Sequence, residues 1–280
     1  MSFGSRLKGD CVIALFQRQM KNMERQSSKG NQLKWLDGEF WYKADYTGYE
    51  GLAEYVISHL LQASTLKKEE YVIYDLEEIQ YGQQCFRGCR SLNFLEEGWQ
   101  LITLERLFQS FLGEGLHKHI YRINDHEERA RFLAEQTEYI TGLQDFGGYL
   151  AKLTAMDAFF LNEDRHTHNI AVLMNEDGQY RYCPIFDNGA GLLSDTSMDY
   201  PLGADIYGLI GTAKACTFCD DFEEQLEIVE KLYGSRLRFS FGRKDVRDLL
   251  DAAVEYPVEI RERVQDILFE QMRKYAYLFG

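Results

Sequence analysis

The chain has 280 residues, of which 45% are hydrophobic and 14% aromatic, enough for one large or two modest domains with a sizeable core. Its formal net charge of −14 argues against a nucleic-acid-binding surface, because phosphate neutralisation needs clustered Lys and Arg. The sequence has no apolar run of about eighteen residues and begins without the apolar region of a signal peptide. We therefore expect a cytoplasmic protein with no membrane span and no direct nucleic-acid partner.

Short apolar segments separated by turn residues dominate the first third and predict strands around one helix. The expected strands are 11–16, 33–36, 40–44, 71–75 and 83–88. The expected helix, 51–62, carries apolar residues at three-to-four spacing along one face. Asp37-Gly38 is a hairpin turn signal that places Lys34 and Lys43 on successive strands. Residues 1–95 are therefore predicted to form a small mixed N-lobe.

From about Leu101 the spacing of apolar residues becomes helical. The expected helices are 101–112, 127–143, 148–161, 222–232, 244–254 and 257–279. One hairpin interrupts them, with strands at 170–174 and 179–185 and the turn Asn175-Glu176-Asp177-Gly178. Residues 96–280 are predicted to form a mainly helical C-lobe. The predicted fold class is α+β, with two lobes facing each other across a cleft.

Two polar segments flank this hairpin, NEDRHTHN (162–169) before it and FDNG (186–189) after it. The hairpin places Asn169 and Asp187 at its open end, where their oxygens suit Mg²⁺, so both are predicted metal ligands. Asp164 precedes Asn169 by five residues, the interval found in a protein-kinase catalytic loop, and is the predicted base for an attacking hydroxyl. Each residue alone reads as an ordinary turn residue. The joint pattern indicates a Mg-dependent phosphotransferase.

Such a site also needs cations on the ATP phosphates. Lys43, within the apolar strand 40–44, is the candidate, although a lysine there could instead extend to solvent from an edge strand. Glu54 on the helix is its predicted partner, as in kinases, with Glu50 as the alternative. The catalytic residues predicted from the sequence are thus Asp164, Lys43 and Glu54.

Small and basic residues in SSKGNQLK (27–34) precede that strand, and their backbone N–H groups could hold phosphates, although an ordinary surface loop is the alternative. Residues 93–96, at the expected lobe junction, could supply backbone contacts to adenine. The predicted ATP-binding residues are Gly30, Asn31, Gln32, Lys34, Lys43, Phe94 and Leu95.

In order and spacing, these motifs resemble those of the HipA-like serine/threonine kinases, including the compact CtkA-type members. The D-R-H-x-x-N order, with arginine after the aspartate, is shared with phosphatidylinositol kinases, whereas eukaryotic protein kinases place the arginine first. The resemblance implies a bilobal protein-kinase-like fold, ATP and Mg²⁺ as cofactors, and a protein substrate. It also implies Asp164 as the catalytic aspartate, Asn169 and Asp187 as Mg²⁺ ligands, and Lys43 on the ATP phosphates.

The resemblance further implies a regulatory serine, because family members autophosphorylate a serine in the phosphate loop. Ser27 and Ser28 occupy that neighbourhood here. The chain is shorter than full HipA toxins, so an antitoxin-like regulator does not follow, and the segment after Gly189 lacks an A-P-E element. A lipid or small-molecule acceptor, AMP transfer, and a pseudokinase that only binds nucleotide therefore stay open as alternatives.

The six cysteines are typical of reduced thiols in a chain of this length. Cys216-Thr217-Phe218-Cys219 has the spacing of a zinc or redox motif. The other close pair, Cys85 and Cys89, lies about a hundred and thirty residues away in sequence, so we expect a structural role for these thiols.

Overall fold

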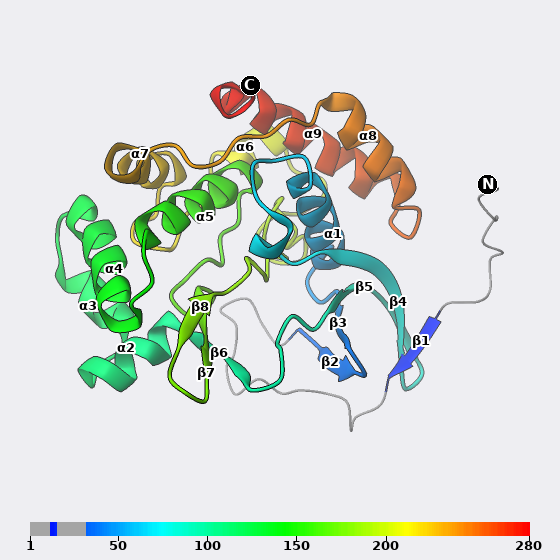
Figure 1. The fold of residues 1–280 in the computed structure, drawn as a ribbon. Coiled ribbons are helices and arrows are strands. Elements are labelled where there is room, and N and C mark those ends of the chain that lie inside the picture. Colours follow the sequence, from blue (N-terminus) through cyan, green and yellow to red (C-terminus); the bar gives the residue numbers. More distant parts are fainter. Residues whose placement is uncertain (1–11, 16–31) are drawn as a thin grey trace.

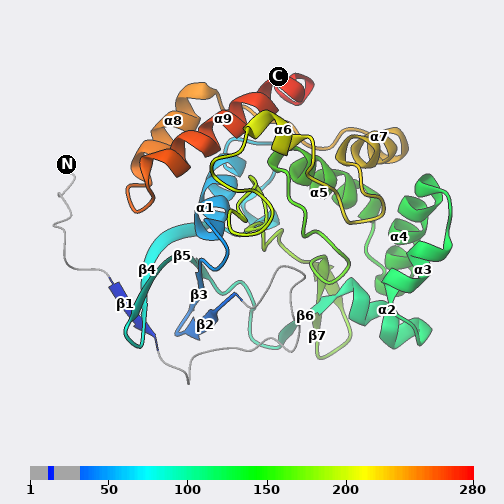
Figure 2. The same cartoon turned by 180° about the vertical axis from the view of Figure 1, so that it is seen from behind.

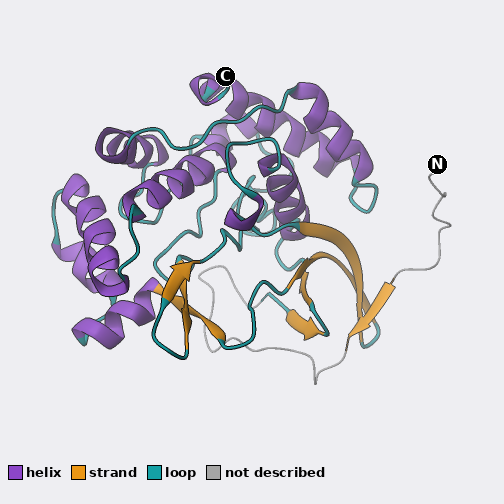
Figure 3. Cartoon of the chain, in the orientation of Figure 1, coloured by secondary structure: helices purple, strands orange, loops and turns teal. Residues whose placement is uncertain are grey.

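The computed structural model describes residues 12–15 and 32–280. A β-rich N-terminal part is followed by a mainly helical part, and the strands gather on one side of the molecule with the helices above and beside them (Figures 1 and 3). The predicted α+β fold class is confirmed. Within the described ranges, no helix has the length and apolar character needed to cross a membrane.

The N-terminal sheet has five strands in the order β1-β4-β5-β3-β2, in which β1 runs parallel to β4 and the other neighbours are antiparallel. Its strands are β1 (Val12–Leu15), β2 (Lys34–Asp37), β3 (Phe40–Ala44), β4 (Tyr74–Tyr81) and β5 (Gln84–Leu92).

The predicted strand 71–75 is wrong for its first three residues. Tyr71 forms only an isolated bridge to Ile185, and the Val72 amide donates to the Ile185 carbonyl (3.0 Å). Tyr71 and Val72 are therefore buried beside the segment after the hairpin, Ile73 is exposed, and the sheet begins only at Tyr74. Apolar content predicted a strand here but could not identify its partner.

Helix α1 (Glu50–Leu61) packs against β4 and β5, and α8 (Arg243–Ala252) also contacts it. Figure 2 shows α1 between the sheet and the C-terminal helices. Residues on all sides of α1 are consequently buried, not only the predicted apolar face. The approach is closest at Gly51, where a Cβ atom would lie 2.6 Å from the carbonyl carbon of Gly88. This contact brings Glu54, one turn further along, towards β3.

A second, antiparallel sheet has the order β6-β7-β8. Strands β7 (Ala171–Asn175) and β8 (Tyr180–Tyr182) form the predicted hairpin, although β8 ends three residues before the predicted bound at 185. Gly178 in its turn has the positive φ of 75° that favours glycine. Strand β6 (Trp99–Thr103) was not predicted, and the helix expected from Leu101 starts only after Thr103. Residues 99–103 pair with β7, a long-range contact that local periodicity does not reveal.

The other expected helices lie within a few residues of their predicted bounds, except that the predicted helix 257–279 ends at Lys274 and is followed by a 3₁₀ turn. Helices α3 and α6, the two shortest, were not predicted. The remaining helices are α2 (Leu104–Leu112), α3 (Leu116–Arg122), α4 (His126–Thr141), α5 (Phe146–Phe160), α6 (Ile206–Ile210), α7 (Phe222–Tyr233) and α9 (Val258–Lys274), with 3₁₀ turns at Lys68–Glu70 and Ala276–Leu278. Helix α5 is buried along nearly its whole length and leads directly into the polar segment 162–169.

Candidate active site

Arg165 holds the polar segment after α5 in place. Its side chain is 2% exposed and forms an ion pair with Asp157 of α5 (Nε to Oδ2, 3.1 Å). The same guanidinium donates to the Phe186 carbonyl (2.7 Å) and to Asn188 Oδ1 (2.5 Å). One buried cation therefore connects α5, segment 162–169 and segment 186–189.

Asp164 and Asn169 contact each other directly. Asn169 Nδ2 donates to Asp164 Oδ2 (3.0 Å) and to the Asp164 carbonyl (2.7 Å). His166 Nε2 lies 3.4 Å from Asp164 Oδ1, whereas His168 is exposed. Because the amide nitrogen of Asn169 is engaged in this way, its amide oxygen is the atom able to bind a cation.

Lys43 lies between two carboxylates. Its Nζ is 2.5 Å from Glu54 Oε1 and 2.7 Å from Asp187 Oδ1. Burial lowers the pKa of Lys43, but the nearby carboxylates of Asp187 and Glu54 raise it by more than burial lowers it. The pKa of Lys43 therefore lies well above its ordinary value, and the lysine is charged. Glu50, the alternative partner, instead accepts from the amide of Thr47 (2.7 Å) in the turn before α1.

Asp187 has a left-handed backbone (φ 59°), which is uncommon for a residue other than glycine and occurs often at functional sites. Its second carboxylate oxygen lies 3.2 Å from Nζ of Lys34, which is paired with Lys43 across β2 and β3. Burial raises the pKa of Asp187, but the two lysines lower that pKa more, so it lies below its ordinary range. The carboxylate is therefore ionised at neutral pH.

A buried polar network joins these groups. Glu54 Oε2 accepts from the backbone N–H of Asn188 (2.9 Å), and the side-chain oxygen Oδ1 of Asn188 accepts from the guanidinium of Arg165. Tyr74 Oη also accepts from Nζ of Lys43 and from the Asp187 amide, both at 3.4 Å. The network thus runs without a break from β3 through α1 to α5.

Sequence reasoning missed three of its members, Asp157, Asn188 and Tyr74. A signal existed for Asp157, since an acid inside an otherwise apolar helix is buried only when it is paired. Nothing in the sequence around Tyr74 predicts its place between Lys43 and Asp187.

The other predicted ATP-binding residues are less completely placed. Phe94 packs against Phe186 with ring centroids 5.9 Å apart, and Leu95 joins an apolar cluster with Ala171 and Leu173. Gln32 is partly buried just before β2. The remaining predicted residues, Gly30, Asn31, Ser27 and Ser28, lie outside the described residues.

The structure resembles that of the Helicobacter pylori proinflammatory kinase CtkA, with a TM-score of 0.60 at 13% sequence identity over 94% of this chain and 95% of that chain. The chain has a kinase fold. HipA, in the complex of the Shewanella oneidensis MR-1 HipA–HipB toxin–antitoxin system with its operator DNA, is also similar (TM-score 0.49, 14% identity, 92% of this chain and 68% of that chain). No protein-family model matches the sequence, and no curated protein matches it. The predicted likeness to CtkA-type kinases is confirmed at the level of the fold.

Proposed function

We propose that the chain is a Mg-dependent ATP phosphotransferase, namely a HipA-like serine/threonine protein kinase. The observation that carries this proposal is one ion-paired cluster of Lys43, Glu54 and Asp187. Arg165 links this cluster to Asp164, because it lies in segment 162–169 and donates to the Phe186 carbonyl in segment 186–189. These residues come from β3, α1 and the two segments flanking the hairpin. A structural ion pair alone does not require this combination of cations, carboxylates and an amide oxygen.

The donor set suits a magnesium ion bound together with ATP. The Asp187 carboxylate and the Asn169 amide oxygen are hard oxygen ligands, and Mg²⁺ is bound by one or two such groups with substrate phosphates completing its coordination. When bound, Mg²⁺ neutralises charge on the transferred phosphoryl group. Lys34 and Lys43 place two cations beside Asp187, where they bind phosphate oxygens.

Asp164 aligns the acceptor hydroxyl and accepts its proton. The carboxylate is fixed by Asn169 and lies beside His166, so it presents a defined direction to the acceptor. Catalysis in this proposal comes mainly from positioning and charge neutralisation, as expected when the transition state demands little covalent chemistry of the protein.

The test is transfer of label from ATP to host-lysate acceptors, with γ-labelled and α-labelled ATP in parallel and the Asp164→Asn variant as control. We expect γ-label on serine or threonine of a protein, and loss of at least about a hundredfold of that signal in the variant. Transfer of α-label indicates AMP addition, labelled lipid indicates another acceptor class, and no transfer despite ATP binding indicates a pseudokinase. Each of these three results contradicts the proposal.

We also propose that residues 30–32 form the phosphate loop and that Ser27 or Ser28 is an autophosphorylation site. Incubation with Mg-ATP is then expected to add roughly 80 Da to peptides containing these serines. The Asp164→Asn protein, treated identically, is the control. Mass spectra that show phosphate elsewhere on the chain, or on neither serine, contradict this assignment.

A further inference from the structure

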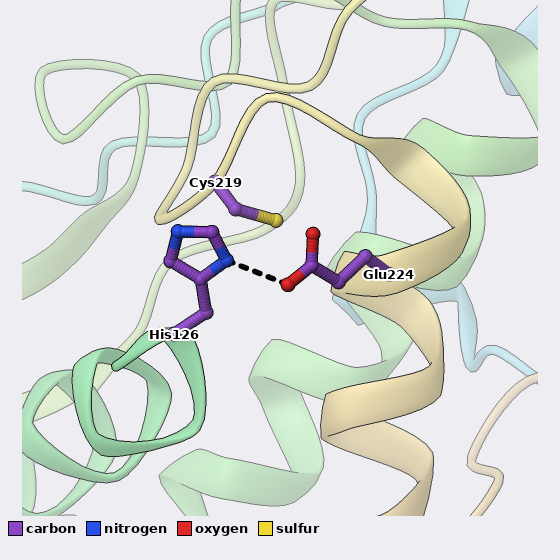
Figure 4. Close-up of side chains that lie close together, drawn as sticks. All are labelled: His126, Cys219 and Glu224. Carbon is purple, nitrogen blue, oxygen red and sulfur yellow. Dashed lines mark hydrogen bonds and ion pairs between the residues drawn. The ribbon is translucent and has the colours of Figure 1, made fainter. Parts of the chain in front are cut away.

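Three side chains of metal-ligating type meet where the start of α4 lies beside the loop before α7 (Figure 4). They are His126, Cys219 and Glu224, and one ligand atom from each lies within 4.8 Å of the others. Cys219 is buried, His126 is partly buried and Glu224 is exposed. The cluster therefore extends from a buried thiol to a solvent-facing carboxylate.

The arrangement differs from that of a histidine-activated thiol. In such a dyad the thiol and the carboxylate bind opposite nitrogens of the ring. Here His126 Nδ1 lies 2.6 Å from Glu224 Oε1, and the sulfur of Cys219 lies on the same side of the ring (Figure 4). Three donor atoms that converge in this way surround a point suited to a shared cation.

Helix caps fix the backbone of the cluster independently of its ligand atoms. Asp125 caps α4 by accepting from the Glu128 amide (2.9 Å), directly before His126. Asp221 caps α7 by accepting from the amides of Glu223 and Glu224 (both 2.8 Å). The ligand-bearing backbone is thus preorganised, which lowers the entropic cost of binding.

We propose that His126, Cys219 and Glu224 bind Zn²⁺, with water as the fourth ligand. Thiolate and imidazole are ligands that zinc prefers, whereas Mg²⁺ takes oxygen donors. Zinc–ligand bonds of about 2.0–2.3 Å place tetrahedral ligand atoms about 3.3–3.8 Å apart. Zinc binding therefore moves His126 Nδ1 and Glu224 Oε1 apart from 2.6 Å, while the Cys219 sulfur, within 4.8 Å of the other ligand atoms, closes in. The Zn–S bond forms as the Cys219 thiol releases its proton to solvent.

The C-x-x-C motif is divided between two environments. The charges that act on the Cys216 thiol include those of Asp164, Asp157 and Arg165, in and beside the catalytic segment. Cys219 instead faces the acidic groups at the start of α7, including Glu224. Zinc binding in this proposal uses the second cysteine alone.

The site connects to the catalytic segment through the backbone between the two cysteines. Thr217 Oγ1 donates to the Arg165 carbonyl (2.8 Å), two residues before Cys219. A metal bound to Cys219 and α4 therefore restrains the segment that supports Arg165. The binding proposal itself is independent of any phosphotransferase activity.

The test is zinc stoichiometry of the full chain, stripped with chelator, reloaded under reducing conditions and dialysed. We expect about one Zn²⁺ per chain for the wild type and a thiolate-to-metal absorption band when Co²⁺ replaces zinc. Cys219→Ser is expected to abolish the band. Glu224→Gln, at an exposed position that does not threaten folding, is expected to weaken zinc binding at least about tenfold.

Cys216→Ser is the matched control, because it removes the other half of the motif and leaves the three ligands intact. It is expected to bind zinc as tightly as the wild type. Loss of zinc in Cys216→Ser assigns the metal to the C-x-x-C pair and overturns the proposal. Absence of stoichiometric zinc in the wild type, or binding unchanged in Cys219→Ser and Glu224→Gln, overturns it equally.

Discussion

At the scale of single residues, the cluster around Lys43 shows what spacing can and cannot predict. The sequence predicted a lysine on the strand and a glutamate on the helix, because both types recur at fixed places in kinase sites. It assigned Lys34 to ATP binding but gave no sign that Nζ of Lys34 lies 3.2 Å from the Asp187 carboxylate. That contact depends on the register of β2 with β3 and on how the sheet meets segment 186–189, neither of which is local.

Glu54→Gln removes one charge from this buried cluster while keeping the shape of the side chain. We expect the free energy of unfolding to fall by about 2 kcal/mol, less than the 3–5 kcal/mol typical of a broken buried pair, because Asp187 still balances Lys43. Urea denaturation provides the measurement. Glu96→Gln, which removes an exposed ion pair with Arg181, serves as control and is expected to cost less than about 1 kcal/mol. Equal losses in the two variants would contradict the account.

At the scale of elements, the packing of α1 on β5 depends on glycine where the two backbones approach most closely. Helical periodicity predicted α1 correctly, but it placed the buried surface on one face only. It could not show that the helix lies between the sheet and α8, since that requires knowledge of residues about two hundred positions away. Strand β6 was missed for the same reason.

Gly51→Ala separates helix propensity from packing. Alanine favours helices over glycine by up to about 1 kcal/mol, so propensity alone predicts stabilisation. The new Cβ would lie 2.6 Å from the backbone of Gly88, and we expect overpacking to destabilise the protein by about 1–3 kcal/mol instead. The control is Gly203→Ala, where no atom lies within 4 Å of the added carbon. A more stable Gly51→Ala protein, judged by its urea midpoint, would refute this view of the contact.

At the scale of the whole molecule, the α+β class was predictable because it follows from local periodicity. The boundary proposed near residue 95 depends on the short segment between β5 and β6, and we retain it as a proposal. Motif spacing identified the residues of the candidate site, whereas their connection through Asn188 and Asp157 required three-dimensional packing. Buried polar partners of this kind carry no spacing rule of their own.

The pH dependence of global stability provides another prediction. Asp45 accepts from the Gly51 amide (2.6 Å) and the Tyr256 hydroxyl (2.8 Å), and burial, with Glu50 adding to it, raises the pKa of Asp45 to about 7. The folded chain therefore keeps this proton from about pH 4 to pH 7 while the unfolded chain loses it, so the contribution of Asp45 to stability declines as pH rises through that window.

Asp45→Asn is expected to remove this decline, which amounts to at most about 1.4 kcal/mol per pH unit for one group. Urea denaturation at pH 5, 6, 7 and 8 measures it, with Asp177→Asn in an exposed turn as the control. Parallel stability profiles for the wild type and Asp45→Asn would show that another group dominates the dependence.

The proposed role of Asp187 in phosphoryl transfer is tested by the rate of γ-phosphate transfer at saturating Mg-ATP, measured for the wild type and for Asp187→Asn. Asparagine tolerates the left-handed backbone at this position, so the variant removes the charge without new strain. Because metal-borne charge stabilisation is worth several kcal/mol, we expect a rate at least about a hundredfold lower in the variant. Equal rates for the two proteins would contradict this role.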